Sequence, residues 1–592
     1  MWEGAIRSVT KLTGTQGRAI QLCGLAMLAT PAFGQQAPLP PQVPPQVAPL
    51  SPTREEVQPP AAAPVARPRV TIEGDIEHSP CLLADAAYAQ YKVTITDAQF
   101  NNLKGIAPEE LRPAYAAYLG QERPVSVICD IRDAAATILR RKGYLAAIQV
   151  PTQRIENGVV RFEVLFARIT AVRVRGDGAR AEGLLQAYLG RLSDAEVFNR
   201  YDAERYLLLA RDLPGYDVRL LLSPAGTGPG DLIGEVTVTR TPLEVDLNIQ
   251  NLASRDTGRF GGQLRAQFYG LTGMGDRTTI AFYNTFDWKE QSILQFGHDY
   301  RVGGQGLTLS GRFTYAWTRP DLATPGLDIN ARTLFATGEA SYPFIRSQAR
   351  NLRGAVGFDY VNQSVKFGAN PLTLDHLRVG YVRLDADATD IGGGAAPRWR
   401  AAGSLELRHG LDIFDATPRV TPAGRVGPSR SDGDATGTLL RYTGQIDYAF
   451  PQGVTVSVLS RGQYGFDPLL SFEEFSAGSY TIGRGYDPGT LIGESGVGVT
   501  GEFRIDRIQP SAKLELALQP FFFVDSAWVW NRGFAGAQRL TSVGGGVRAS
   551  FANRVRLDMT LSVPTKRAGL LATKPDPRLL VSLTTKLWPW VR

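Results

Sequence analysis

The sequence predicts a membrane β-barrel of about 16 antiparallel strands that follows two small α+β domains. Three observations support this fold class. The first 34 residues have the order of an export signal, residues 70–240 show one β-α-α-β-β pattern twice, and residues 241–592 alternate apolar and polar side chains. The 592-residue chain is 43% hydrophobic and 20% charged, which is enough apolar sequence for several cores and excludes a disordered protein.

Residues 1–34 are predicted to be a signal peptide. Three basic residues precede an apolar run from Ala19 to Ala29, and the small residues Ala32 and Gly34 stand before the expected cleavage point. The alternative is a soluble amphipathic start. The run is too short to cross a bilayer as a helix, and no later segment is long and apolar enough. Any residence in a membrane must therefore come from a closed barrel.

Residues 35–69 are predicted to be an extended, proline-rich linker. Proline recurs so often that helix and sheet are both ruled out over most of this span. A tether for an exported protein is one role for such a segment, and a ligand for a proline-reading domain is the other.

Residues 70–167 and 168–240 are predicted to form the two α+β domains. In the first, "VTIEG" and "KVTITDAQF" have strand patterns, as do "LAAIQVPTQ" and "VVRFEVLFARI". Between them, "EELRPAYAAYLGQ" and "VSVICDIRDAAATILRRKGY" have the apolar spacing of helices. The second domain shows the same order from "ITAVRVRGDG" to "LIGEVTVTR".

Residues 241–592 are predicted to form the barrel. In "LTLSGRFTYAW" Leu307, Phe313 and Trp317 share one face, and Arg312 and Thr314 lie on the other. An apolar face toward lipid and a polar face toward a wet lumen explain this alternation, although a soluble sheet alternates as well. The export signal and the number of strands favour the membrane, and at about 22 residues per strand and turn there is room for about 16 strands.

Composition argues against nucleic-acid binding and against catalysis. The net charge is +7, but lysine and arginine are scattered through strand-like stretches, so we expect no nucleic-acid partner. The four histidines are isolated, and neither a metal-ligand spacing nor a nucleophile elbow is present, so we expect no catalytic residue, cofactor or metal site. After cleavage only Cys81 and Cys129 remain, and they form either a disulfide or two free buried thiols.

Each of the two α+β domains contains one long segment with a distinctive pattern, "RKGYLAAIQVPTQRIENGVVRFEV" in the first and "LPGYDVRLLLSPAGTGPGDLIGEVTV" in the second. These segments resemble the paired POTRA domains of two-partner secretion transporters of the ShlB/FhaC/HecB type, the hemolysin secretion and activation proteins. The resemblance implies an outer-membrane barrel whose periplasmic POTRA domains receive an unfolded exoprotein, an adhesin or a hemolysin-like protein with an N-terminal secretion domain. It also implies contact with outer-membrane lipid and insertion by the barrel-assembly machinery. An exposed strand edge suits such recognition.

The segment "FEEFSAGSYTIGRGYDPGTLIGESGVGVTGEFR" resembles the sixth extracellular loop of this family, which enters the pore and here spans about residues 467–496. The family motif, V-R-G-Y or V-R-G-F, stands here as Gly483, Arg484, Gly485 and Tyr486, with glycine in place of valine.

The stretch "FVDSA" is similar to a family pattern on a barrel strand, and there the resemblance implies a partner for Arg484. Phe523 and Asp525 share one face of the strand, so Asp525 is predicted to point into the lumen and to contact Arg484. The alternative is that Arg484 is one more lumenal arginine. An ion pair in a hydrated lumen contributes about 1 kcal/mol, whereas the loss of one partner after partial burial costs about 3 kcal/mol or more. We therefore expect this pair to fix the position of the loop rather than to supply much stability.

The resulting prediction is an outer-membrane transporter that binds an unfolded exoprotein through its POTRA domains and passes it through the barrel. The alternatives are a barrel-assembly insertase of the same superfamily and a passive porin. Many family members plug the pore with an N-terminal helix. Because this chain begins in proline-rich sequence after the expected cleavage, the presence of such a helix stays open, and without it the sixth loop must occlude the pore alone.

Overall fold

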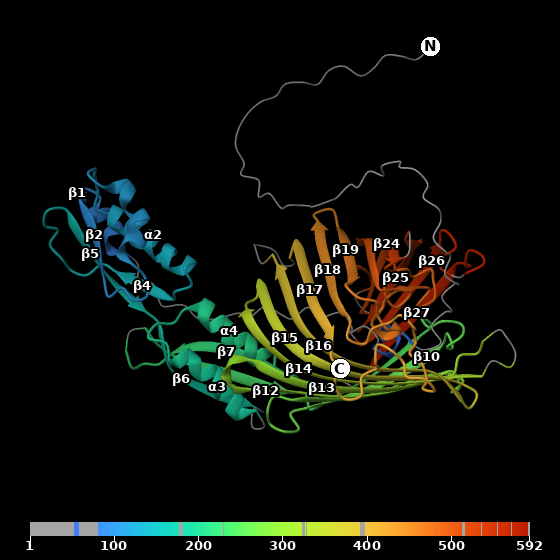
Figure 1. The fold of residues 1–592 in the computed structure, drawn as a ribbon. Coiled ribbons are helices and arrows are strands. Elements are labelled where there is room, and N and C mark those ends of the chain that lie inside the picture. The colour runs from blue at the N-terminus through green and yellow to red at the C-terminus, as the bar shows by residue number, and fades with distance from the viewer. Residues whose placement is uncertain are drawn as a thin grey trace, which may run out of the picture. The chain divides into compact units, whose positions relative to one another are not determined.

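The computed structural model describes residues 52–58 and 81–589, apart from short gaps at 177–180, 229, 323–325, 327, 391–396, 512–514, 534–535, 553 and 570. Figure 1 shows the ribbon of the chain. The predicted signal peptide, most of the predicted linker and the strand predicted at 70–74 lie outside the described residues.

The first α+β domain packs helix α2 on a three-stranded sheet. The sheet order is β2-β5-β4, with β2 parallel and β4 antiparallel to β5. Its elements are η1 (Leu82–Ala84), η2 (Ala86–Tyr88), β1 (Lys92–Thr94), β2 (Asp97–Asn101), η3 (Pro108–Ala114), η4 (Ala116–Tyr118), β3 (Glu122–Pro124), α2 (Val127–Arg141), β4 (Ala146–Gln149) and β5 (Val159–Phe166). The predicted first helix is instead two 3₁₀ helices, because Pro113 lacks the N–H that an α-helix would use there.

The second α+β domain has the same topology with two α-helices. Its elements are β6 (Arg168–Gly176), α3 (Glu182–Ser193), α4 (Arg200–Arg211), β7 (Tyr216–Pro224) and β8 (Asp231–Arg240). The sheet order is β6-β8-β7, again with a central strand that pairs one parallel and one antiparallel neighbour. Leu185 and Leu207 from the helices and Val236 from the sheet are buried in one core.

Residues from Leu243 onward form a closed antiparallel barrel in which β27 pairs with β9. Strand β22 and the short β23 lie one after the other along β24 and count together as one strand, so the described residues form a wall of sixteen strands. The wall strands are β9 (Leu243–Gln250), β10 (Gly261–Tyr269), β11 (Arg277–Thr285), β12 (Gln291–Val302), β13 (Leu307–Thr318), β14 (Ile329–Arg346), β15 (Arg350–Phe367), β16 (Asn370–Thr389), β17 (Trp399–Gly410), β18 (Thr438–Phe450), β19 (Val454–Gly465), β22 (Ser495–Ile505), β23 (Ile508–Ser511), β24 (Leu516–Trp530), β25 (Gln538–Phe551), β26 (Val555–Pro564) and β27 (Arg578–Trp588).

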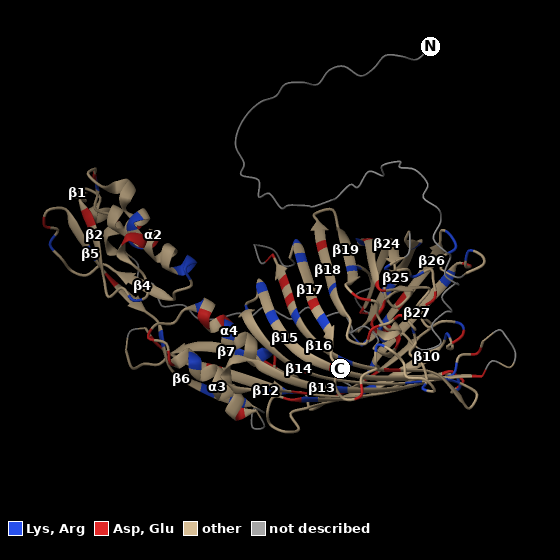
Figure 2. Cartoon of the chain, in the orientation of Figure 1, with Lys and Arg blue, Asp and Glu red and all other residues tan. Residues whose placement is uncertain are grey.

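The two faces of the wall differ as the alternation predicts. On β24, Phe522 and Val524 are 61% and 52% exposed on the outside, whereas Phe523 and Asp525 are buried inside. Figure 2 shows charged residues spread along many wall strands rather than gathered in one patch. None of the helices in the described chain is long and apolar enough to cross a membrane.

The base of the barrel is the end at which β9 begins with Leu243 and β27 ends with Trp588, and the rim is the opposite end. At the rim, residues 466–494 connect β19 to β22 and are called the pore loop. The pore loop contains η6 (Ser471–Glu473), β20 (Phe475–Ala477) and β21 (Leu491–Gly493), and β20 pairs with β21.

Candidate functional site

The pore loop folds back into the barrel and is buried against the wall. Phe475, Ile482, Tyr486 and Leu491 are each no more than 1% exposed. They pack in one cluster with wall residues that include Leu540 of β25. The loop is therefore held in the barrel by apolar packing as well as by the polar contacts described next.

Arg484 of the pore loop and Asp525 of β24 form a bidentate ion pair. The Nε and Nη2 atoms of Arg484 donate to the two carboxylate oxygens at 3.1 and 3.0 Å, and the Arg484 backbone N–H donates to Oδ2 at 2.9 Å. Asp525 is 0% exposed and the Arg484 side chain is 18% exposed. The pair is thus buried rather than hydrated, which is the case in which the loss of one partner costs about 3 kcal/mol or more.

Neighbouring strands complete the surroundings of this pair. Thr500 of β22 lies directly opposite Asp525 in the ladder and donates its hydroxyl at 2.9 Å. Glu502, two residues further along β22, accepts from Nη1 of Arg484 at 3.0 Å. The Arg484 guanidinium also lies over the Phe523 ring, 3.5 Å from its centroid. The sequence analysis did not identify Thr500 and Glu502 as members of this site. Their spacing of two residues, which places them on one strand face, is the signal that could have done so.

The two glycines of the motif serve different purposes. Gly483 has φ of +119°, and a Cβ there would lie 2.6 Å from the Leu540 side chain. A valine at this position would be strained, so the glycine here matches a local backbone path that the usual family residue could not take. Gly485 has ordinary φ, but a Cβ there would lie 2.9 Å from the backbone nitrogen of Pro564.

Tyr486 closes the contact between the pore loop and the wall. Its hydroxyl donates toward the backbone oxygens of Thr541 and Lys566, at 3.0 and 2.7 Å, and its side chain is fully buried. The Gly485 N–H donates to Oγ of Ser542 at 3.2 Å. Gly483, Arg484, Gly485 and Tyr486 therefore all meet the wall between β22 and β26.

A second segment also occupies the lumen. Helix α1 (Arg54–Val57) has four residues and is capped by a reciprocal box between Thr53 and Glu56. It lies within the predicted linker, in the proline-free stretch "TREEVQ", and this capping box is the sequence signal that identifies it. Val57 is 0% exposed and packs with Phe335 and Phe472. Because α1 is present in the lumen, the pore loop does not fill the barrel alone.

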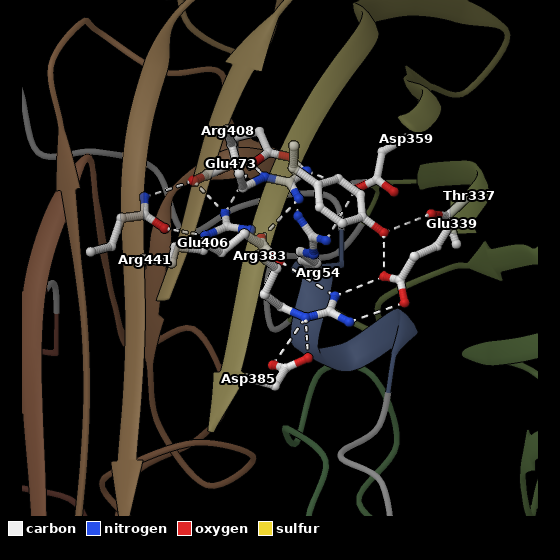
Figure 3. Close-up of polar contacts among 12 residues, drawn as sticks. Arg54, Thr337, Glu339, Asp359, Arg383, Asp385, Glu406, Arg408, Arg441 and Glu473 are labelled. Atoms are coloured by element: carbon white, nitrogen blue, oxygen red, sulfur yellow. Dashed lines mark hydrogen bonds and ion pairs between the residues drawn. The ribbon is translucent and has the colours of Figure 1, made fainter. Parts of the chain in front are cut away.

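Charged residues connect α1, the pore loop and the wall (Figure 3). Glu473 of the pore loop accepts from Arg54 at 3.2 Å, from Arg408 of β17 at 2.9 Å and from Arg441 of β18 at 3.0 Å. Asp359 of β15 accepts from Arg54 at 3.1 Å and from Arg408 at 2.7 Å. Both lumenal segments are therefore tied to the same buried network.

The first α+β domain carries a separate groove beside a free strand edge. A cavity of about 620 Å³ lies between η1, α2 and the edge strand β4, and its lining includes Leu82, Tyr88, Ile128 and Gln149. A disulfide joins Cys81 to Cys129 with the Cα atoms 6.0 Å apart, and Cys81 is part of the lining. The disulfide therefore fixes η1, one wall of the groove, to α2.

No metal site accompanies these features among the described residues, where no group of His, Cys, Asp or Glu side chains is placed to hold an ion.

Comparisons with known proteins support this architecture. The family model for the haemolysin secretion/activation protein ShlB/FhaC/HecB matches residues 233–549, and the model for the ShlB-type POTRA domain matches residues 93–166. A search of curated proteins finds no match. The fold is similar to that of CdiB from Escherichia coli, with TM-score 0.69 and 15% identity over 87% of this chain and 94% of that one. It is also similar to CdiB from Acinetobacter baumannii, with TM-score 0.61 and 16% identity over 87% of this chain and 95% of that one.

The chain forms a closed barrel that follows α+β domains in the sequence, and the family model spans most of that barrel. These findings establish the family and the outer-membrane location, with the POTRA domains in the periplasm. The chain belongs to the ShlB/FhaC/HecB family of haemolysin secretion/activation proteins, the two-partner secretion transporters.

Proposed function

We propose that this transporter binds an unfolded exoprotein at its POTRA domains and passes it through the barrel to the cell surface. Two segments occupy the lumen, α1 and the pore loop, and neither is a strand of the wall; both are held to the wall by side-chain contacts. This observation carries the proposal. Such segments can move aside without unfolding the barrel. The apolar outer face would contact outer-membrane lipid, and the barrel-assembly machinery would insert the chain.

Recognition is assigned to the groove of the first POTRA domain. Strand β4 lies at the edge of its sheet, so one side of its backbone is free to pair with an extended segment. The apolar residues Leu82 and Tyr88 at the groove can take alternate side chains of that segment, while backbone pairing requires no particular sequence. This combination suits an unfolded protein of varied sequence.

Passage of the exoprotein through the barrel requires that α1 and the pore loop move out of their positions in the lumen. Arg54 and Arg484 hold these segments through ion pairs to Asp359 and Asp525, which are 1% and 0% exposed. The buried wall carboxylates keep other partners when the segments leave, namely Arg408 for Asp359 and Thr500 for Asp525. The wall is thus left with partly satisfied polar groups that water in the lumen can complete.

Direction would come from folding of the exoprotein outside the cell, because no nucleotide is available in the periplasm. An exoprotein that is locked in an unfolded state is then expected to stall in export. Normal export of such a variant would contradict this source of directional bias.

A site-specific photocrosslinker tests recognition by the groove. Gln149 on β4 and Gln99 on β2 are both exposed glutamines, and they lie at opposite edges of the same sheet. A crosslinker at position 149 should capture the exoprotein during export, and the same group at position 99 should not. Equal capture at both positions, or none at position 149, would remove the groove from the proposal.

Deletion of the gene tests the function itself. Mass spectrometry of the culture supernatant and of the outer membrane is compared with the gene intact and deleted. Loss of one large secreted protein with an unchanged outer membrane is expected for a dedicated transporter. Broad loss of barrel proteins would instead indicate an insertase, and an unchanged supernatant would favour a passive porin.

A further inference from the structure

The contact between the first and last strands of the barrel is short and leaves the rim incomplete. The β9–β27 ladder runs from Gln250 opposite Ser582 to Val245 opposite Trp588, with a register shift after Lys586. It is shorter than the β9–β10 and β26–β27 ladders on either side. Strand β27 begins at Arg578, so its first residues extend beyond the end of β9. This junction is called the seam.

A side chain continues the ladder where β9 ends. Asn251 donates its backbone N–H to the Val581 oxygen at 3.2 Å, and its Oδ1 accepts from the Val581 N–H at 2.7 Å. Its Nδ2 donates to the Leu579 oxygen at 2.8 Å. Between Asn251 and the rim, the described contacts across the seam involve the side chain of Arg578 and the pore loop.

Arg578 lies at the rim of the seam and is almost fully buried. Its Nη1 donates to the Tyr486 oxygen of the pore loop at 2.6 Å and lies 2.8 Å from Oδ1 of Asp487. Its Nη2 donates to the Ala253 oxygen, in the segment that follows β9, at 3.3 Å. The side chain is 5% exposed, and Asp487 is the one carboxylate within 4.0 Å of it among the described residues. A buried guanidinium that loses its counter-charge is strongly disfavoured.

The pore loop also reaches the other side of the seam. Oδ2 of Asp487 lies 3.8 Å from Nη2 of Arg259, in the connection between β9 and β10. Ser479 of the pore loop donates its hydroxyl to the Leu252 oxygen at 2.6 Å. One loop therefore contacts the end of the first strand and the start of the last strand.

We propose that Asp487 and Arg578 form a second anchor of the pore loop, a seam anchor, which couples the seating of the loop to the closure of the barrel between β9 and β27. When the loop leaves, Arg578 loses its carboxylate, and the rim of the seam keeps the Asn251 contacts and the bond from Arg578 to the Ala253 oxygen. By linkage, whatever opens the rim of the seam also favours release of the loop. The inference rests on the proposed function only in that it assigns the loop a movement.

The seam anchor is separate from the Arg484 anchor. Arg484 binds the wall at β22 and β24, whereas Arg578 is on β27, and β25 and β26 lie between them. A variant at Asp487 can therefore loosen the seam without removing the Arg484 contact. This makes the two anchors separable in one purified protein.

Distances between spin labels on the full-length protein in lipid vesicles test the coupling. One label pair, at Phe260 and Leu579, spans the seam with β9 between them; the control pair, at Val543 and Leu579, spans β26 instead. All three positions are exposed on the outside. In Asp487→Asn the seam pair should gain a population longer by about one strand spacing, ~5 Å, while the control pair stays unchanged. Asp487→Glu keeps the charge and should restore the short distance.

Two outcomes would overturn the seam anchor. One is an unchanged seam distance in Asp487→Asn, and the other is an equal change in both label pairs, which would indicate general loosening of the barrel. The measurement needs no exoprotein. A failure of the secretion assay would therefore leave this result standing, and a failure here would leave the proposed function untouched.

Discussion

Replacing Asp525 by alanine should release the pore loop from the wall. Asp525 is 0% exposed and accepts three N–H groups of Arg484 and the hydroxyl of Thr500. Removal of one partner of a buried ion pair costs 3–5 kcal/mol in general, and about 3 kcal/mol is appropriate here because Arg484 is 18% exposed and keeps Glu502. Since 1.4 kcal/mol corresponds to a factor of ten, the ratio of unseated to seated loops should rise about 100-fold.

Single-channel recording in planar bilayers measures this ratio as the fraction of time spent in the open state. Asp525→Ala is expected to raise that fraction strongly in the absence of any exoprotein. The matched control is Asp246→Ala, which removes another bidentate arginine–aspartate pair, formed with Arg265 between β9 and β10. The described polar partner of Asp246 is a wall residue and not part of the pore loop. The open fraction of Asp246→Ala should therefore match that of the wild type.

Equal open fractions in Asp525→Ala and Asp246→Ala would refute the role of the Arg484–Asp525 pair in holding the pore loop. A rise in both would show that any loss of a wall ion pair loosens the barrel. No rise in either would show that the pore loop is held by its apolar cluster, around Ile482 and Tyr486, without help from the ion pair.

Three further predictions concern the loop glycine, α1 and the disulfide. Gly485→Val should unseat the loop and raise the open fraction, because its Cβ would meet the backbone of Pro564, whereas Gly501→Ala has open space and should behave as the wild type in the same recordings. Arg54→Ala should raise the open fraction through loss of the contacts to Asp359 and Glu473, and an open fraction equal to that of the wild type would contradict a polar hold on α1. Cys81→Ser with Cys129→Ser removes a crosslink over a sequence separation of 48 and should lower the stability of the first POTRA domain by about 4 kcal/mol, seen as faster proteolysis of that domain in the full-length protein; cleavage as slow as in the wild type would refute it.

The class of the fold can be predicted from the sequence alone, because strand and helix periodicities are local properties. The alternation in "LTLSGRFTYAW" and the helical spacing of Ile128, Ile131 and Leu139 both correspond to elements of the structure, β13 and α2. The pairing of Arg484 with Asp525 is implied by the family resemblance. The spacing of 41 residues between them has no local signal, and their contact arises because the pore loop folds back into the barrel and lies against β24.

The segments that fill the lumen and the contacts that close the barrel depend on long-range packing. Helix α1 has four residues, too few for a periodicity, and it is held by partners more than 300 residues away, such as Asp359. Arg578 and Asp487 are far apart in the sequence and meet only because the last strand returns to the first. Long-range ion pairs depend on how a closed sheet brings strands together, and a linear pattern of residue types does not contain that information.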